Sequence, residues 1–174
     1  TARKIAEGLA EKGIFALDAP VSGGDIGAIN GTLTIMLGGE ESALNKAMPV
    51  LEAMGKSITL VGDAGAGQIA KVCNQIIVAA QMVGMAELLI VAQKAGADPQ
   101  KVVQAIKGGA AQCWALDIKP PRLFEGNREP GFKAYMQAKD LNIVLDTARE
   151  YGVPVPGTAA NTQLFSAMLE MGMG

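Results

Sequence analysis

The chain has 174 residues, of which 49% are apolar and 18% are charged, so it is long enough and apolar enough to bury a core. It contains no histidine, which excludes a Ser-His-Asp triad, a histidine proton shuttle and every histidine-based metal site, and we expect no metal. The 15 basic and 17 acidic residues nearly balance and form no basic stripe, so we expect no binding to nucleic acid.

The two cysteines, Cys73 and Cys113, lie in apolar stretches and lack the spacing of a metal or redox motif. We predict buried, reduced thiols, which are typical of a cytoplasmic protein. No membrane span is predicted, because the least charged segments, 72–86 and 153–169, are shorter than a membrane-spanning helix.

The first 64 residues alternate between helical and strand-like patterns, which predicts part of an α/β layer. Short apolar or β-branched runs predict strands, and apolar residues at helical spacing predict helices. In chain order the predicted elements are a helix at 2–12, strands at 14–17 and 32–37, a helix at 40–54 and a strand at 58–61.

The remaining residues, 65–174, contain no convincing strand and predict an all-α domain. It begins with one very long helix at 68–95, and shorter helices are separated by glycine and proline turn signals. Asp98 followed by Pro99 predicts the N-cap of the next helix. The shorter helices are predicted at 98–107, 112–124, 132–151 and 157–171.

A polar stripe lies at the start of the long helix. Lys71, Asn74 and Gln75 share one face, whereas the rest of the helix is apolar on nearly every side and should be covered by neighbours or partners. The helix N-terminus and burial both disfavour the ammonium form of a lysine, which makes Lys71 a candidate general acid or base. The alternative, which the spacing alone favours, is that Lys71 extends to solvent and Asn74 caps a backbone group.

The glycines that open this helix, Gly65-x-Gly67-x-x-Ala70, imitate a dinucleotide fingerprint. We reject that interpretation, because the fingerprint needs a short helix and then a strand, whereas this helix continues. A phosphate-binding P-loop is excluded as well, because Gln68 stands where that motif requires a lysine.

Two other segments are candidates for chemistry. In the segment 18–24 (DAPVSGG), Pro20 predicts a turn at a strand end, and Ser22 with the two glycines after it exposes a hydroxyl and N–H groups that suit a carboxylate. The alternative is an ordinary glycine-rich turn. Lys139 and Asp140 lie on a predicted helix, where the alternative is a solvated charge pair.

Together these motifs resemble those of the β-hydroxyacid dehydrogenase family, which includes 3-hydroxyisobutyrate dehydrogenases and tartronate semialdehyde reductases. The segment 18–24 is similar to the family's substrate-binding motif, 65–74 to its catalytic motif, and 139–141 (KDL) to its cofactor-proximal motif. Gln75 and the segment 23–28 are most similar to the tartronate semialdehyde reductases. The resemblance implies a partial Rossmann-type sheet at 1–64, the C-terminal part of an NAD(P)-binding α/β domain, joined through the long helix to an all-α dimerisation and substrate domain at 65–174.

The resemblance also implies a role for each matching residue. Lys71 would protonate the carbonyl oxygen of a small semialdehyde as hydride arrives from NAD or NADP. Asn74 would hydrogen-bond the substrate near the reacting carbon, and Lys139 and Asp140 would lie toward the cofactor. The substrate carboxylate would be held by Ser22, Gly23 and Gly24.

Members of this family begin with a βαβ unit that carries Gly-x-Gly-x-x-Gly, and the 174 residues include no such unit. We therefore expect a fragment that shows no appreciable hydride transfer by itself, and a homodimer or homotetramer formed through the helix at 68–95. Two alternatives stay open. One is a non-catalytic helical oligomerisation module. The other is a 6-phosphogluconate dehydrogenase-like enzyme, which would need more basic residues than Lys71 and Lys139 to hold a phosphate.

Overall fold

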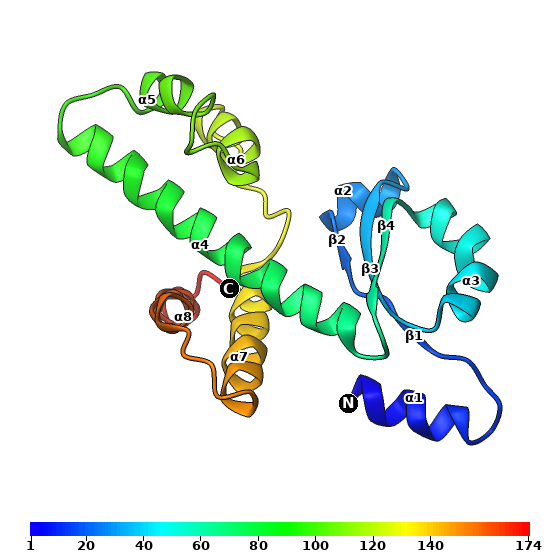
Figure 1. The fold of residues 1–174 in the computed structure, drawn as a ribbon. Coiled ribbons are helices and arrows are strands. Elements are labelled where there is room, and N and C mark those ends of the chain that lie inside the picture. The colour runs from blue at the N-terminus through cyan, green and yellow to red at the C-terminus, as the bar shows by residue number, and fades with distance from the viewer. The chain divides into compact units, whose positions relative to one another are not determined.

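The computed structural model describes residues 1–174, which divide into two compact units, Thr1–Asn74 and Gln75–Gly174 (Figure 1). The boundary between these units falls inside the longest helix, α4 (Ala66–Lys94). The first unit holds, before α4, α1 (Ala2–Ala10), β1 (Leu17–Asp18), β2 (Val21–Ser22), α2 (Gly24–Ile29), β3 (Leu33–Gly39), α3 (Glu41–Met54) and β4 (Gly55–Gly62). The second unit holds, after α4, α5 (Pro99–Ile106), α6 (Trp114–Phe124), α7 (Ala134–Glu150) and α8 (Pro156–Glu170).

Strand β3 is the centre of the sheet. It pairs in parallel with β4 and antiparallel with both β1 and β2. Leu17 pairs with Gly39 and Val21 pairs with Ile35, so β1 and β2 keep one register and continue each other along the same edge of β3. The break between them contains Pro20, which has no N–H to give to a strand ladder.

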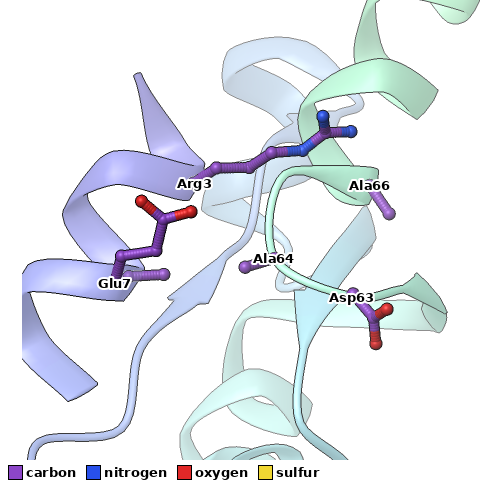
Figure 2. A pocket seen from close by; sticks show the side chains of 6 residues that line it. Arg3, Glu7, Asp63, Ala64 and Ala66 are labelled. Atoms are coloured by element: carbon purple, nitrogen blue, oxygen red, sulfur yellow. The ribbon is translucent and has the colours of Figure 1, made fainter.

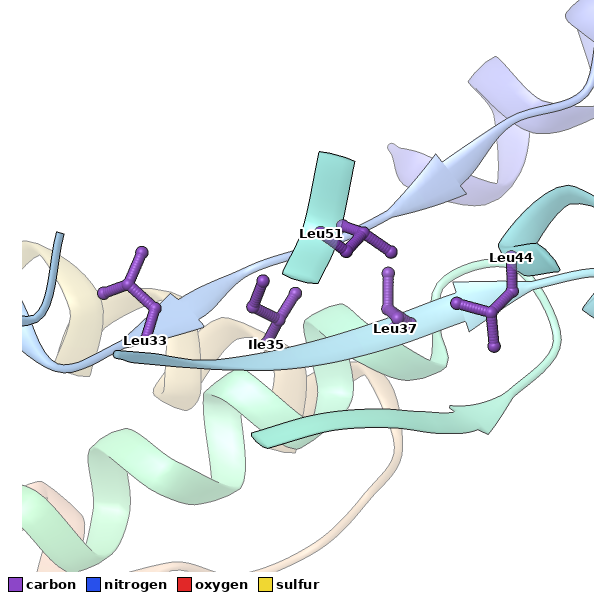
Figure 3. Close-up of a cluster of buried hydrophobic side chains, with 5 residues drawn as sticks. All are labelled: Leu33, Ile35, Leu37, Leu44 and Leu51. Atoms are coloured by element: carbon purple, nitrogen blue, oxygen red, sulfur yellow. The ribbon is translucent and has the colours of Figure 1, made fainter. Parts of the chain in front are cut away.

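The core of the first unit lies between β3 and α3. Alternate residues of β3 point toward the helix because side chains of a strand alternate between its faces. Ile35 and Leu37 are fully buried, and Figure 3 shows the β3 side chains meeting those of α3. This cluster consists of Leu33, Ile35, Leu37, Leu44 and Leu51. It fixes β3, and through the ladder it fixes the edge formed by β1 and β2.

Two expectations for the first unit were wrong. The apolar run at 14–17 is not a buried strand: Ile14 is 50% exposed and Phe15 52%, and strand pairing begins only at Leu17. The chain also does not turn at Pro20, because the Pro20 carbonyl accepts a hydrogen bond from the Met36 N–H at 3.0 Å and the chain keeps following β3. It reverses instead at 23–24, where both glycines have positive φ, 136° and 64°, a region that favours glycine. The short helix α2 that follows was not predicted.

The second unit is all-α, as the sequence predicts, and each predicted helix is present within about two residues of its expected ends. The N-cap expected at Asp98 is confirmed, because its carboxylate accepts the Gln100 N–H at 2.9 Å and the Lys101 N–H at 3.4 Å. Two apolar clusters line α4. The first joins it to α7 and α8 through Ala79, Ala138, Leu141 and Phe165, and the second joins it to α5 and α6 through Met85, Val103 and Leu116.

The chain itself covers only part of α4. Ile77, Ile90 and Val91 are between 56% and 66% exposed, so the expected burial on nearly every side is not achieved within this chain. By length and composition alone α4 could cross a membrane, contrary to the expectation from the length of the least charged segments. The two apolar clusters instead show it as a helix around which other helices pack. Both cysteines were expected to be buried, but Cys73 is exposed and Cys113 only half-buried. Both are free thiols, as predicted.

Candidate active site

The start of α4 is held by a carboxylate from a neighbouring strand. Asp18, at the end of β1, accepts the Gly65 N–H at 2.5 Å through Oδ1 and the Gln68 N–H at 2.9 Å through Oδ2. The first N–H groups of a helix lack partners within the helix, and an aspartate is a favoured acceptor for them. Here the cap comes from a residue 47 to 50 positions earlier in the chain, so it ties α4 to the sheet edge.

Glycines make room for this cap. A Cβ on Gly67 would lie 2.5 Å from the Met36 carbonyl oxygen and 2.8 Å from Oδ2 of Asp18. A Cβ on Gly38 would lie 2.5 Å from Oδ1 of the same carboxylate. All three distances are too short for real atoms, so these two positions accept only glycine unless the backbone moves. Gly38 and Gly67 therefore allow the close approach of helix α4 to the sheet.

The same contacts explain why this turn is no phosphate cradle. An N-terminal turn binds phosphate through its open N–H groups, but those of Gly65 and Gln68 are taken by Asp18. The helix also runs on to Lys94, as the sequence-based rejection of a dinucleotide fingerprint requires. The residues of this turn do not fit a dinucleotide phosphate.

Lys71 lies one turn further along α4 and reaches the edge strand. Its Nζ donates a hydrogen bond to the Val21 carbonyl oxygen at 2.9 Å. The next residues are Ser22, half-buried on β2, and the glycines that turn the chain into α2. The structure thus brings together the lysine and the DAPVSGG segment, which lie about 50 residues apart in sequence. Lys71 does not simply extend to solvent. Asn74 follows on the same side of α4 and is half-buried.

Lys139 and Asp140 lie on α7, in the second unit. Lys139 Nζ is 2.9 Å from Oδ1 of Asp140, and the lysine side chain is 65% exposed whereas that of the aspartate is 14% exposed. The other oxygen of Asp140 accepts a hydrogen bond from Nε2 of buried Gln75 at 2.7 Å. Asp140 is therefore held by α4, whereas the Lys139 side chain is mostly exposed.

A buried amide pair extends this network. Gln75 also donates to Oε1 of Gln137, and Nε2 of Gln137 donates to the Gln75 carbonyl oxygen, both at 3.3 Å. Gln75 and Gln137 are 4% and 3% exposed. Buried polar groups of this kind need partners, and these two provide for each other.

An open cavity of about 450 Å³ lies where α1 meets the turn before α4 (Figure 2). Arg3 and Glu7 contribute from α1, and Asp63 and Ala64 from the turn. In Figure 2 the Arg3 side chain extends over this turn. None of the predicted site residues lines the cavity.

Sequence reasoning included Asp18 and Gln75 in its motifs but gave neither a structural role. For Asp18 a signal was present: an acidic residue at a strand end has the chemistry of an N-cap, but its partner helix lies some 50 residues away. For Gln75 the position on the polar face was the signal, and only the packing of α7 against α4 showed its partner.

Comparison with known proteins decides the family. Residues 65–174 match the model of the NAD-binding domain of NADP-dependent 3-hydroxyisobutyrate dehydrogenase, and residues 1–62 match the NAD-binding domain of 6-phosphogluconate dehydrogenase. The chain belongs to the β-hydroxyacid dehydrogenase family. Both domain descriptions name NAD binding, so a nicotinamide dinucleotide is the cofactor of this β-hydroxyacid dehydrogenase family member.

Individual relatives agree with this assignment. The chain is 48% identical over 171 residues to the uncharacterized oxidoreductase YkwC of Bacillus subtilis, covering 98% of this chain and 59% of that protein. It is 45% identical over 164 residues to the 2-hydroxy-3-oxopropionate reductase of Escherichia coli, covering 94% and 56%. Among solved structures, a 3-hydroxyisobutyrate dehydrogenase of Mycobacterium tuberculosis with L-serine is 36% identical, with a TM-score of 0.90 over 96% of this chain and 60% of that one.

The chain spans less than two thirds of the length of these relatives. The family and the partial Rossmann-type sheet followed by a helical domain are thus confirmed.

Proposed function

We propose that the protein containing this chain is an NAD- or NADP-dependent oxidoreductase of a small 3-hydroxy acid and its semialdehyde, with Lys71 as the proton donor. One observation carries the proposal: the hydrogen bond of 2.9 Å from Lys71 Nζ to the Val21 carbonyl oxygen, which brings an amine to the middle of the segment that resembles the substrate-binding motif.

When bound, the reduced nicotinamide supplies a hydride to the carbonyl carbon of the semialdehyde. The electron pair of the carbonyl π bond then moves onto the oxygen, and this oxygen takes a proton from the Lys71 ammonium. The products are the alcohol, the oxidised nicotinamide and a neutral lysine amine, which regains its proton from water. General acid catalysis of this kind contributes typically 10²- to 10⁴-fold to the rate.

The other matching residues bind and orient. Ser22, Gly23 and Gly24 hold the substrate carboxylate through the hydroxyl and backbone N–H groups, and Asn74 bonds the substrate close to the reacting carbon. Lys139, with its exposed ammonium, faces the cofactor, and Asp140 keeps that lysine in place through the ion pair of 2.9 Å.

The substrate class follows from the chemistry that the relatives' names share. 2-Hydroxy-3-oxopropionate, 3-hydroxyisobutyrate and L-serine each carry a carboxylate one carbon away from a terminal hydroxymethyl or aldehyde group. A carboxylate at the glycine turn would bring that terminal oxygen within reach of Lys71. Among the three, we propose 2-hydroxy-3-oxopropionate, because Gln75 and the segment 23–28 are most similar to its reductases.

The substitution Lys71→Ala in the full-length protein tests this function. Reduction of 2-hydroxy-3-oxopropionate, followed by the absorbance of the reduced cofactor with NADH and with NADPH, should fall by at least about 100-fold while the fold is kept. Lys94→Ala, at the exposed end of the same helix, is the matched control and should turn over normally. Unchanged turnover by Lys71→Ala would contradict the proposed role and favour a non-catalytic helical module.

The oligomeric state, the cellular location and the behaviour of the 174 residues alone are further proposals. The exposed apolar residues Ile77, Ile90 and Val91 of α4 support a homodimer or homotetramer formed through this helix, which sedimentation of the full-length protein tests. We propose a cytoplasmic location. The 174 residues alone, which span 56% of the E. coli reductase, should show no appreciable hydride transfer, and robust turnover by this chain would refute that.

A further inference from the structure

We infer that Asp18 is a positioning residue for Lys71, acting through the cap that it places on α4. The inference rests on the proposed function. It concerns Asp18, which belongs to the segment that resembles the substrate-binding motif but to which that resemblance assigns no role of its own.

Two contacts on α4 converge on one short stretch of edge strand. The Asp18 carboxylate binds the N–H groups of Gly65 and Gln68, at the very start of the helix. Val21 lies three residues after Asp18, and Lys71 lies three residues after Gln68. The Val21 carbonyl oxygen accepts a hydrogen bond from the Lys71 ammonium. The two contacts and the two chain segments form a closed ring. Within this ring the cap sets how far the first turn of α4 lies from the edge strand, and therefore where Nζ of Lys71 comes to lie.

The ring has little freedom. The Asp18 backbone is held by its pairing with Gly38 on β3, and this strand is anchored by its fully buried side chains Ile35 and Leu37. The carboxylate lies between the backbones of Gly38 and Gly67, where even a methyl group would lie 2.5 to 2.8 Å from its oxygens. A carboxylate enclosed so tightly cannot swing to another partner, so its two hydrogen bonds transmit the position of the sheet to the helix.

A displacement of the proton donor should show in the kinetics. Misplacing a reacting group by about 1 Å can cost on the order of 100-fold in rate. The amide of Asp18→Asn keeps one acceptor oxygen but turns an NH₂ group toward one of the two N–H donors, so one of the capping bonds is lost. The closed ring of contacts then loses one hydrogen bond at Asp18, while Lys71 and the glycine turn are unchanged.

The experiment compares Asp18→Asn with Asp98→Asn in the full-length enzyme. Asp98 caps α5 through the same kind of carboxylate bonds to two N–H groups, and it has no part in the proposed site. We expect Asp18→Asn to lower kcat about 10- to 100-fold, to raise the solvent isotope effect on kcat, and to leave KM for the cofactor unchanged. The isotope effect should rise because proton transfer from a displaced lysine limits the rate more strongly. Asp98→Asn should change none of these values.

A kcat for Asp18→Asn within twofold of the unaltered enzyme, with no change in the isotope effect, would overturn the inference and leave Asp18 as a helix cap only. If Asp18→Asn does not fold, Asp18→Ser, a favoured N-cap that keeps one acceptor, carries the same comparison. Lys71→Ala is measured beside them. If that variant is fully active the proposed function fails, whereas an inactive Lys71→Ala with normal Asp18 variants refutes only the positioning role.

Discussion

Gly67→Ala tests whether the close approach of α4 to the sheet is as tight as the structure shows. The added Cβ would lie 2.5 Å from the Met36 carbonyl oxygen and 2.8 Å from both the carbonyl oxygen and Oδ2 of Asp18. Two of these three atoms belong to backbone, so the helix must shift. Overpacking of this kind typically costs about 1 to 3 kcal/mol, and the better helix propensity of alanine returns at most about 1 kcal/mol. If alanine returns the full amount of about 1 kcal/mol, we expect a net loss of up to about 2 kcal/mol.

Gly8→Ala is the matched control, because Gly8 lies inside helix α1 of the same unit and a Cβ there meets no atom within 4 Å. This variant should gain about 0.5 to 1 kcal/mol from propensity alone. Urea unfolding of both variants measures the free energies, and the reduction assay measures whether Gly67→Ala also displaces Lys71. A Gly67→Ala protein as stable as Gly8→Ala would refute the reasoning.

Two other changes probe the helical unit. Gln75→Leu removes the donor to Oδ2 of Asp140 and the hydrogen bond to buried Gln137. Because a hydrogen bond to a charged group is lost, the free energy of unfolding should fall by about 2 kcal/mol in a denaturant titration. An unchanged unfolding midpoint would contradict the network. Burial, and secondarily the nearby charge of Arg122, lower the pKa of Lys119 below 10.5, its usual value. Between the lowered pKa and 10.5 the unfolded chain therefore binds more protons than the folded chain, so stability should rise with pH through that window. Lys119→Gln should flatten this rise, measured by thermal unfolding at several pH values. An identical slope in that variant would refute the role of Lys119 in the pH dependence.

Local patterns predicted the helical half of the chain closely. Asp98 before Pro99 is an N-cap signal that needs no tertiary context, and the structure confirms it. The prediction of a buried strand at 14–17 was wrong. A continuous apolar stretch resembles a buried strand, but Ile14 and Phe15 are half exposed. Helix α2 was missed because its sequence, GDIGAI, contains two glycines, and glycine disfavours a helix interior.

The candidate site was only partly accessible from sequence. Spacing along one helix singled out Lys71 and Asn74, and the resemblance connected Lys71 to the glycine turn. No periodicity could show that Lys71 bonds the Val21 carbonyl or that Asp18 caps the same helix, because both contacts join segments about 50 residues apart. Such contacts depend on how β1 and β2 lie along β3, which is set by the burial of Ile35 and Leu37.

The span of these contacts also bears on the order of folding. The β3–α3–β4 segment closes through neighbours in sequence, whereas the contacts of Asp18 and Lys71 with their partners span 47 to 50 residues. Long-range contacts are entropically costly until the segments they join are held by other structure. The sheet should therefore form first and the helix start should dock afterwards, so that weakening this docking accelerates unfolding more than it slows folding. Lys71, the proposed proton donor, would then be among the last groups of the first unit to reach its folded position.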